Sequence, residues 1–440
     1  MSFRQPKRAT LKKKGWSWLV LLGLVTIVSS GIGWSHLGHA IAFSSPVTVA
    51  DDADPATDPA GPTGAGATYL PLVAQATPDT PVPVNTAARL LLPIVAQQQP
   101  RYQRLGFGAV SNLRSLTQVS DLQAGWYLNW SVNSAPNRPN GIEYAQVVRV
   151  HQRLTCQSPD RDACPYVVPY AYDFKPDEAT IRLAARNNPG ALWFIGNEMD
   201  RRDWFGGSQD EMLPEVYAVA YHDLHAIIKS EDPTARVANG GVIQATPLRL
   251  QYLTTVWDTY LSLYGHVMPV DVWNVHNFIL REVSGSWGAD IPPGSDATVG
   301  EYADDPTTHI NMAIFDQQIR AFRQWMKDRG QQDKPLLVNE YGVLLPNTVF
   351  GYPENDSAVV ANFMTSTFDY FLNAKDCNIG YAADDCRLVQ RWAWYSLDDE
   401  SIYNPYQYLL DPATGLLTAT GQAYRNFAQQ NSAILARPIP

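Results

Sequence analysis

Two glutamates in this sequence directly follow apolar runs and could act as a catalytic pair. The segment 193–198 reads Trp-Phe-Ile-Gly-Asn-Glu and ends at Glu198, and the segment 335–342 reads Pro-Leu-Leu-Val-Asn-Glu-Tyr-Gly and contains Glu340. An apolar run of this length predicts a strand buried on both faces, so a glutamate at its end lies at the rim of a parallel sheet. Cleavage of a glycosidic bond needs two such groups, because one carboxyl protonates the leaving oxygen and a second carboxylate attacks or activates water.

Polar residues beside this pair could assist it. Asn197 could donate a hydrogen bond to a sugar hydroxyl or to the opposite carboxylate, and Asp200 is placed to cap the next helix. His276 could hold the nucleophile or bind a hydroxyl, or it could be a histidine whose hydrogen bonds are satisfied at the rim. If Glu198 is the proton donor its pKa must be raised, and burial together with the charge of Glu340 would raise it.

Aromatic side chains near the predicted strand ends could form sugar subsites, because their faces pack against the apolar faces of sugar rings. The tryptophans could equally be packing residues of the core, since tryptophan is usually well buried. With the polar residue Asn129, the candidate substrate-binding residues besides Asn197 and His276 are Trp126, Trp130, Trp204, Tyr341 and Trp394.

The order of apolar runs and helical patterns predicts an α/β fold, a single (β/α)8 TIM barrel over residues 101–437. The predicted helices are 176–186, 213–229, 248–264, 310–329 and 356–373. A long segment rich in Gly, Pro and Asp, residues 281–308, follows the sixth predicted strand and would lie at the active face. The eight predicted strands are 105–110, 124–128, 166–170, 192–196, 236–239, 270–275, 336–339 and 389–394.

The N-terminal 100 residues differ in composition from the rest. Residues 1–42 carry six basic and no acidic side chains, and the basic residues all precede an apolar stretch, which predicts a signal peptide or a signal anchor. Residues 43–100 are rich in Pro, Ala and Thr and predict a disordered linker. The repeat of Leu-Pro-Leu/Ile-Val-Ala-Gln at 70–75 and 92–97 is a docking segment or a low-complexity coincidence. We therefore expect a chain that is secreted or held at the outer face of the membrane.

Removal of residues 1–42 would change the net charge from -10 to -16, because that segment holds six basic and no acidic side chains. Such a charge disfavours nucleic acid as a partner and suits a neutral poly- or oligosaccharide. The sequence has no GxSxG, HExxH, Walker or GxGxxG motif, so we expect no cofactor and no metal. The four cysteines form two close pairs, Cys156 with Cys164 and Cys377 with Cys386. In an exported chain these predict disulfides rather than zinc ligands, although three connectivities remain formally possible.

Five short motifs resemble clan A of the glycoside hydrolases, and most closely family 128, which contains endo-β-1,3-glucanases. That family shows a Trp-Tyr-Asn-Trp-like strand, Asn-Glu-Pro-Asp, an aromatic-rich His strand, Thr-Glu-Phe-Gly and Arg-Tyr-Ala-Trp in this order. The matching segments here are 126–130 (Trp-Tyr-Leu-Asn-Trp), 197–200 (Asn-Glu-Met-Asp), 273–278 (Trp-Asn-Val-His-Asn-Phe), 339–342 (Asn-Glu-Tyr-Gly) and 391–394 (Arg-Trp-Ala-Trp).

The resemblance implies a retaining β-glycosidase with Glu198 as acid/base and Glu340 as nucleophile, acting on a β-linked polysaccharide such as β-glucan. Met199 replaces the usual Pro, and Asn339 replaces Thr, beside the sugar. A mannanase, xylanase or galactanase of the same clan is therefore an alternative. A surface barrel that binds polysaccharide without cleaving it is another, but it would not need to retain both glutamates.

Overall fold

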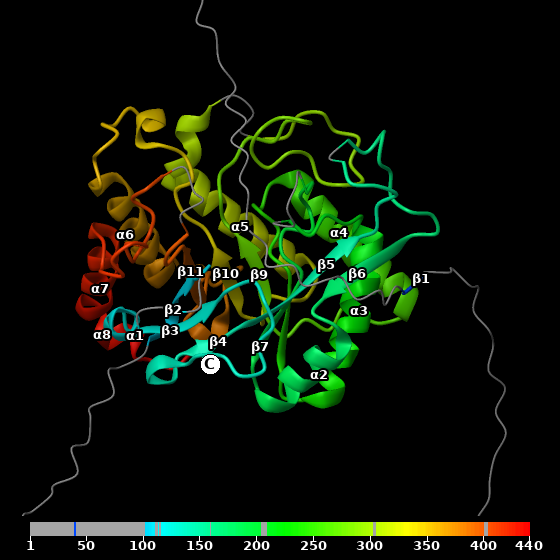
Figure 1. Ribbon diagram of the computed structural model, residues 1–440, viewed down its shortest axis with the longest axis horizontal. Coiled ribbons are helices and arrows are strands. Elements are labelled where there is room, and N and C mark those ends of the chain that lie inside the picture. Colours follow the sequence, from blue (N-terminus) through cyan, green and yellow to red (C-terminus); the bar gives the residue numbers. More distant parts are fainter. Residues whose placement is uncertain are drawn as a thin grey trace, which may run out of the picture. The chain divides into compact units, whose positions relative to one another are not determined.

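The structure is a computed structural model of the chain (Figure 1). It describes residues 39–40, 102–110, 113, 116–158, 160–203, 209–301, 305–399 and 404–440. The predicted signal or anchor segment, apart from His39 and Ala40, and the predicted linker therefore lie outside the described residues. Within the described ranges, no helix has both the length and the apolar character needed to cross a membrane.

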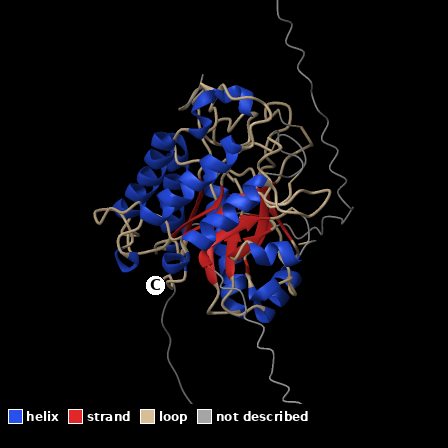
Figure 2. Cartoon of the chain, turned by 90° about the vertical axis from the view of Figure 1, so that its left-hand side faces the viewer, coloured by secondary structure: helices blue, strands red, loops and turns tan. Residues whose placement is uncertain are grey.

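Strands occupy the centre of the described part and helices surround them (Figure 2). The strands are β1 (His39–Ala40), β2 (Tyr102–Gly108), β3 (Ala124–Leu128), β4 (Glu143–Tyr144), β5 (Gln146–Gln152), β6 (Ala171–Lys175), β7 (Leu192–Ile195), β8 (Arg236–Asn239), β9 (Trp273–His276), β10 (Leu336–Glu340) and β11 (Arg391–Tyr395). The α-helices are α1 (Leu116–Asp121), α2 (Glu178–Asn187), α3 (Pro214–Glu231), α4 (Pro247–Tyr264), α5 (Met312–Asp328), α6 (Ala358–Asn373), α7 (Ala419–Gln430) and α8 (Ser432–Leu435). Short 3-10 helices cover Pro139–Gly141, Pro306–Ile310, Asn347–Phe350 and Ala382–Asp384.

The strands form two hydrogen-bonded sheets. A six-stranded sheet has the order β4-β3-β2-β11-β10-β9, and all its pairs are parallel. A second sheet has the order β1-β6-β5-β7-β8, in which β5, β7 and β8 pair in parallel and β6 pairs antiparallel with β1 and β5. Strand-helix alternation and parallel pairing confirm the predicted α/β class.

Contacts join these two sheets at both ends. On one side, Ala145 alone separates β4 from β5 in the chain, and the N–H of Val147 in β5 donates to the carbonyl of Ser131, beyond the end of β3, at 3.0 Å. On the other side, Ala238 of β8 forms a parallel bridge with Val272, the residue before β9, and the N–H of Asp271 donates to the carbonyl of Val237 at 2.9 Å. The carboxyl ends of the parallel strands of both sheets can therefore contribute to one site.

The prediction of the third strand is wrong. Residues 166–170 contribute only an isolated bridge between Tyr166 and Leu154, because Pro169 interrupts the segment and cannot donate to a ladder. The strand in this position is β5, whose polar Arg149 and His151 hid it from a search for apolar runs. The other seven predicted strands and all five predicted helices are present, with ends shifted by at most three residues.

Side chains alternate between an inner core and a layer of helices. Trp273 of β9 faces outward and packs against Trp257 of α4 and Trp325 of α5, with ring centroids 6.1 and 5.0 Å apart. The inner cluster comprises the buried side chains Trp126, Leu128, Ala145, Val147, Leu192, Phe194, Ala238, Val272, Leu337 and Ala393. This alternation decides which residues beyond the strand ends face the centre.

The two predicted cysteine pairs are disulfides. Cys156 is bonded to Cys164, with Cα atoms 5.3 Å apart, and Cys377 is bonded to Cys386, with Cα atoms 4.7 Å apart. Each bond closes a short loop outside the inner cluster, and the described part of the chain holds no free cysteine. The connectivity that pairs near neighbours in sequence is therefore confirmed.

Candidate active site

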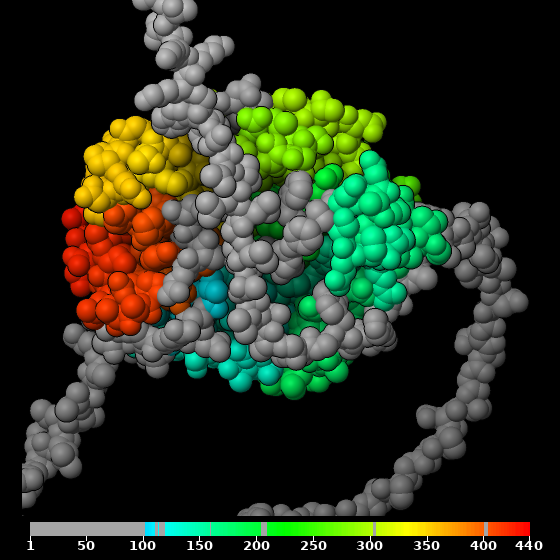
Figure 3. Space-filling view, turned by 45° about the horizontal axis from the view of Figure 1, so that its top comes forward, coloured from blue at the N-terminus to red at the C-terminus, as the bar shows by residue number. Residues whose placement is uncertain are grey.

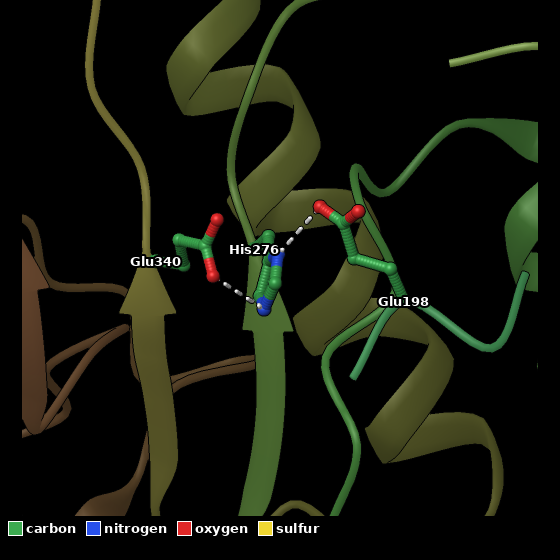
Figure 4. A group of neighbouring side chains, drawn as sticks. All are labelled: Glu198, His276 and Glu340. Carbon is green, nitrogen blue, oxygen red and sulfur yellow. Dashed lines mark hydrogen bonds and ion pairs between the residues drawn. The ribbon is translucent and has the colours of Figure 1, made fainter. Parts of the chain in front are cut away.

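Glu198, His276 and Glu340 meet at the carboxyl ends of β7, β9 and β10 (Figure 4). His276 lies between the glutamates, with Nδ1 3.2 Å from Oε1 of Glu198 and Nε2 3.8 Å from Oε2 of Glu340. One nitrogen or oxygen from each side chain lies within 4.8 Å of the other two. All three residues are buried, and Glu340 is the most exposed at 8%. The structure thus brings together the two predicted glutamates, whose catalytic role remains a prediction.

A β-bulge in β10 turns Glu340 toward this centre. In the parallel pairing with β9, Val338 lies opposite Val275 but Glu340 lies opposite His276, so Asn339 is an extra residue. Because side chains alternate along a strand, the extra residue moves Glu340 to the face on which His276 lies. Without the bulge, Glu340 would share the outward face of Val338.

The backbone after β7 takes an unusual path at Glu198. Gly196 and Glu198 have positive φ angles of 89° and 53°. For a residue with a side chain this left-handed conformation costs roughly 1–2 kcal/mol, and such residues are concentrated at functional sites. The N–H of Glu198 donates to the carbonyl of Gly241 at 2.9 Å, which fixes the turn to the segment after β8.

The two glutamates differ in their electrostatic surroundings. Nη1 of Arg201 donates to Oε2 of Glu198 at 2.7 Å, whereas Glu340 accepts from Nε1 of Trp130 at 2.9 Å. Burial alone would raise the pKa of Glu198, but the charge of Arg201 and the hydrogen bond and charge of His276 lower it to about 2. Burial, assisted by the charge of Glu198, raises the pKa of Glu340 to about 7 against the opposing charge of His276.

These directions correct the expectation that the pKa of Glu198 is raised in the free protein. Burial and the charge of Glu340 would both raise the pKa of Glu198, but the cation of Arg201, which contacts Glu198 directly, and His276 together outweigh them. Below about pH 7 these directions favour Glu198 as the carboxylate and Glu340 as the acid that holds the shared proton.

His276 lies between the two acids, and both of them favour its charged form. Burial would lower the pKa of this imidazole, but the charge of Glu340 and the hydrogen bond and charge of Glu198 raise it above its usual value. Its Nε2 is buried and has no hydrogen-bond partner among the described residues. The ring thus presents one N–H to Glu198 and a second N–H toward Glu340.

The same three side chains form the one group in the described ranges whose histidine and carboxylate atoms are close enough to consider a metal ion. Each ring nitrogen of His276 faces a different carboxylate, however, and Arg201 occupies an oxygen of Glu198. These are the contacts of a hydrogen-bonded acid-base group, so no metal enters the chemistry proposed below.

Three other predicted residues lie around this centre in different ways. Trp130 contacts Glu340 through its indole N–H, as described above. Asn197 precedes Glu198 and is 5% exposed, and its backbone N–H donates to Oδ2 of Asp210 at 2.8 Å. Asn129 turns away, because its Oδ1 accepts from the hydroxyl of Ser131 at 2.7 Å and from the hydroxyl of Tyr144.

The structure places three further predicted residues in the packed core. Trp126 belongs to the inner cluster below the site, where its ring contacts Phe194. Tyr341 and Trp394 are fully buried, their rings pack edge to face 5.3 Å apart, and Trp394 donates to the carbonyl of Gln407. These three residues are therefore not part of the proposed sugar site. Trp204 lies outside the described residues.

Three residues of the site escaped the sequence reasoning: Arg201, Gly241 and Tyr395. Tyr395 follows the buried Trp394 on β11, and its ring contacts Trp130 at a centroid distance of 5.5 Å. Alternation along β11 could have indicated Tyr395, because Ala393 belongs to the inner cluster and Tyr395 lies two positions later on the same face. For Gly241 the pair of glycines after β8 was a usable signal, whereas the sequence gives no comparable indication for Arg201.

Asp200 does not cap the next helix as predicted, because α3 begins at Pro214. It is fully buried and forms an ion pair with Arg249, which also pairs with Glu282 at 2.9 Å. Arg249 further donates to the carbonyls of Ala289 and Asp290 at 2.8 and 2.7 Å. This network joins the turn after β7 to the segment after β9.

Long segments surround the face on which the three side chains meet. The segment after β9, residues 277–301, is called the β9 loop below. In the space-filling view it lies above a hollow, and the connection between β5 and β6 lies to the right of the same hollow (Figure 3, yellow-green and teal). The β9 loop carries Trp287, whose side chain is 48% exposed. A hollow bordered by long loops can receive an extended ligand.

The chain matches no protein-family model and no curated protein. Among solved structures, it is similar to a GH128 subgroup I endo-β-1,3-glucanase from Amycolatopsis mediterranei in complex with laminaritriose, at 16% identity over 74% of this chain and 99% of that chain, with a TM-score of 0.44. It is also similar to a glucosidase from Croceicoccus marinus, at 12% identity over 75% and 68% of the two chains (TM-score 0.46), and to a GH5_18 protein from Streptomyces cattleya in complex with GlcNAc, at 13% over 78% and 82% (TM-score 0.41). At such identities, and with TM-scores below one half, these likenesses assign neither substrate nor mechanism.

Proposed function

We propose that this protein is a retaining glycoside hydrolase that cleaves a β-linked polysaccharide, with β-glucan as the favoured substrate. The observation that carries the proposal is the approach of two buried carboxylates, Glu198 and Glu340, to within 4.8 Å at the ends of parallel strands. Retaining enzymes place their two carboxyl groups about 5–5.5 Å apart, whereas inverting enzymes leave about 6.5–9.5 Å for a water molecule. The short separation favours a double displacement.

The proposed scaffold is a closed (β/α)8 barrel. Its support is that parallel neighbours follow one another in a closed order: β2, β3, β4 continued by β5, β7, β8, β9, β10, β11 and again β2. In this order the Ala238–Val272 bridge supplies the link between β8 and β9. In this fold, side chains that follow the carboxyl ends of different strands converge on the active face. Glu198, His276 and Glu340 occupy such positions.

In the first chemical step, Glu198 gives a proton to the leaving oxygen while a carboxylate oxygen of Glu340 bonds to the anomeric carbon. The glycosidic bond breaks and its electron pair goes to the leaving oxygen. In the second step, Glu198 takes a proton from water, and the oxygen of that water displaces Glu340 from the sugar. Both carboxyl groups then return to their starting states.

This mechanism requires Glu198 to gain a proton and Glu340 to lose one when the sugar binds. His276 lies on the direct path between them. The imidazolium can give its Nδ1–H to Glu198, which leaves a neutral ring with its hydrogen on Nε2, while Glu340 gives its own proton to water. The remaining Nε2–H can then donate to the Glu340 carboxylate, once the 3.8 Å separation at Nε2 shortens to hydrogen-bond length. The net result is a protonated Glu198, an ionised Glu340, a neutral imidazole and one proton released to water.

β-Glucan is favoured because five motifs, in order along the chain, resemble those of glycoside hydrolase family 128. Mannan, xylan and galactan are tested beside it, because Met199 and Asn339 depart from that family next to the catalytic glutamates. Export to the outer face of the cell, through the N-terminal segment, is part of the same proposal.

The test is release of reducing sugar by the purified full chain from β-1,3-glucan, β-1,4-glucan, mannan, xylan and galactan. Glu340→Gln is the inactive variant, and Glu354→Gln, an exposed glutamate in the segment after β10, is the matched control. We expect release from one polymer that is lost in Glu340→Gln and kept in Glu354→Gln. Absence of release from every polymer, together with retention on one of them in a pull-down, would replace this proposal with a carbohydrate-binding role.

A further inference from the structure

Arg201 connects the candidate acid Glu198 to the β9 loop. Its Nη1 donates to Oε2 of Glu198 and its Nη2 donates to the carbonyl of Gly288, both at 2.7 Å. The Arg201 side chain is 17% exposed, so this pair is largely shielded from water. A guanidinium can hold two such acceptors in a fixed relative position because its N–H groups lie in one plane.

The β9 loop is itself firmly held at the point that Arg201 contacts. Arg249 donates to the carbonyls of Ala289 and Asp290. Together with the bond from Arg201 to Gly288, three successive carbonyls of this loop accept hydrogen bonds from arginines. Gly288 has a φ of 105°, and a side chain there would lie 2.6 Å from the carbonyl oxygen of Arg281. The acceptor that orients Arg201 is therefore a fixed feature of the fold.

Several charged or titratable groups surround Glu198, and Arg201 is the arginine in direct contact with its carboxylate. From the remaining elements, Arg149 of β5 and Tyr395 of β11 act on it at longer range. The groups that face Glu198 are Asp200 and Arg201 from its own turn, Arg149 from β5, His276 from β9, Glu340 from β10 and Tyr395 from β11.

We propose that Arg201 is a positioning residue that holds Glu198 in its carboxylate form and in a fixed orientation against the β9 loop. This inference rests on the proposed function for its catalytic meaning. In the double displacement Glu198 acts first as an acid and then as a base. A cation that favours the carboxylate opposes the first step and assists the second, in which Glu198 must accept a proton from water.

The direct test is a titration of the Glu198 carboxyl carbon by NMR in protein labelled with ¹³C at glutamate side chains, with the signal assigned by its loss in Glu198→Gln. The variants are Arg201→Gln, which removes the charge, and Arg201→Lys, which keeps it. Arg202→Gln is the control, because Arg202 lies in the same turn but pairs with Asp290 at 3.7 Å. This readout does not depend on turnover.

We expect the Glu198 midpoint to rise by about 1–3 pH units in Arg201→Gln, because an adjacent opposite charge shifts a carboxyl by that amount. Arg201→Lys should restore most of the wild-type midpoint, and Arg202→Gln should match it. Both limbs of the kcat/KM profile should move upward in Arg201→Gln, the acidic limb because the pKa of Glu198 rises and the alkaline limb because the charge of Arg201 also lowers the pKa of Glu340.

An unchanged Glu198 midpoint in a folded Arg201→Gln protein overturns the inference, whatever the activity. If the wild-type protein releases no sugar and the Glu198 midpoint still rises in Arg201→Gln, the proposed function is overturned but the positioning role of Arg201 stands. Thermal unfolding of each variant identifies loss of fold, and Arg201→Lys then provides the comparison with the charge retained.

Discussion

Gly241 lies directly against the imidazole of His276. A Cβ built on Gly241 would be 2.2 Å from Cδ2 and 2.5 Å from Nε2 of His276, which is closer than atoms can approach. The same residue accepts the backbone N–H of Glu198 through its carbonyl at 2.9 Å. One glycine therefore leaves room for the ring that bridges the two acids and also fixes the turn that carries one of them.

Gly241→Ala should displace His276 and lower kcat about 10²-fold, because a misplacement of about 1 Å in a catalytic group costs that much. The comparison is Gly265→Ala at the end of α4, where φ is 70° and no atom lies within 4 Å of the added Cβ. That change should cost roughly 1 kcal/mol of stability through backbone strain and leave kcat unchanged. Equal kcat values in the two variants would show that the ring position does not matter.

The assigned roles of the two glutamates predict different responses to the leaving group. Glu198→Gln should keep much of its rate on aryl glycosides with activated leaving groups, which need no proton, and should lose about 10²–10⁴-fold on poor leaving groups. Glu340→Gln should abolish turnover of both, because it removes the nucleophile. Initial rates over a series of aryl glycosides measure this. A flat dependence in Glu198→Gln on leaving-group pKa would contradict the acid role.

The apolar runs predicted β7 and β10, and the glutamates that follow them, because both strands are buried on both faces and are therefore apolar along most of their length. The direction of a side chain at or beyond a strand end depends on which face of the strand it occupies and on the geometry of the turn that follows. Apolar patterns do not encode either of these. The bulge at Asn339 reverses the face of Glu340, and alternation on β11 places Tyr395 rather than Trp394 at the site. Arg201 returns to Glu198 only because the chain turns back after a left-handed residue.

The same limit explains β5 and Asp200. In β5 the polar Arg149 is satisfied by an ion pair with Asp210, a partner distant in sequence that no local pattern reveals. Asp200 was assigned to a helix cap on spacing alone, but its partner Arg249 lies in α4. Long-range ion pairs of this kind become visible only once the elements are placed in space.

The buried network around Arg249 should be a large contributor to stability. Arg249→Met leaves Asp200 and Glu282 buried without their cation, which should cost about 3–5 kcal/mol. Arg182→Gln removes partly exposed ion pairs with Glu178 and Glu231 and should cost far less, because water screens such pairs. Urea unfolding of both variants gives the comparison. Similar costs would mean that the Arg249 network is worth no more than a surface pair.

The opposite pKa shifts of the two acids predict opposite dependences of stability on pH. The pKa of Glu340 rises from 4.5 to about 7 on folding, so its contribution is fully present below pH 4.5 and is lost as pH rises through 7. The pKa of Glu198 falls from 4.5 to about 2, so its contribution is present above pH 4.5 and is lost as pH falls toward 2.

Replacement by the neutral glutamine should therefore act in opposite directions at pH 8. Glu340→Gln should be more stable than wild type by roughly 1–3 kcal/mol, because the wild-type protein must bury an ionised carboxylate there, and the difference should vanish near pH 4. Glu198→Gln should be less stable than wild type at pH 8, because Arg201 loses its ionised partner. Urea unfolding at both pH values measures this, and the same sign for both variants at pH 8 would contradict the assignment of the resting proton to Glu340.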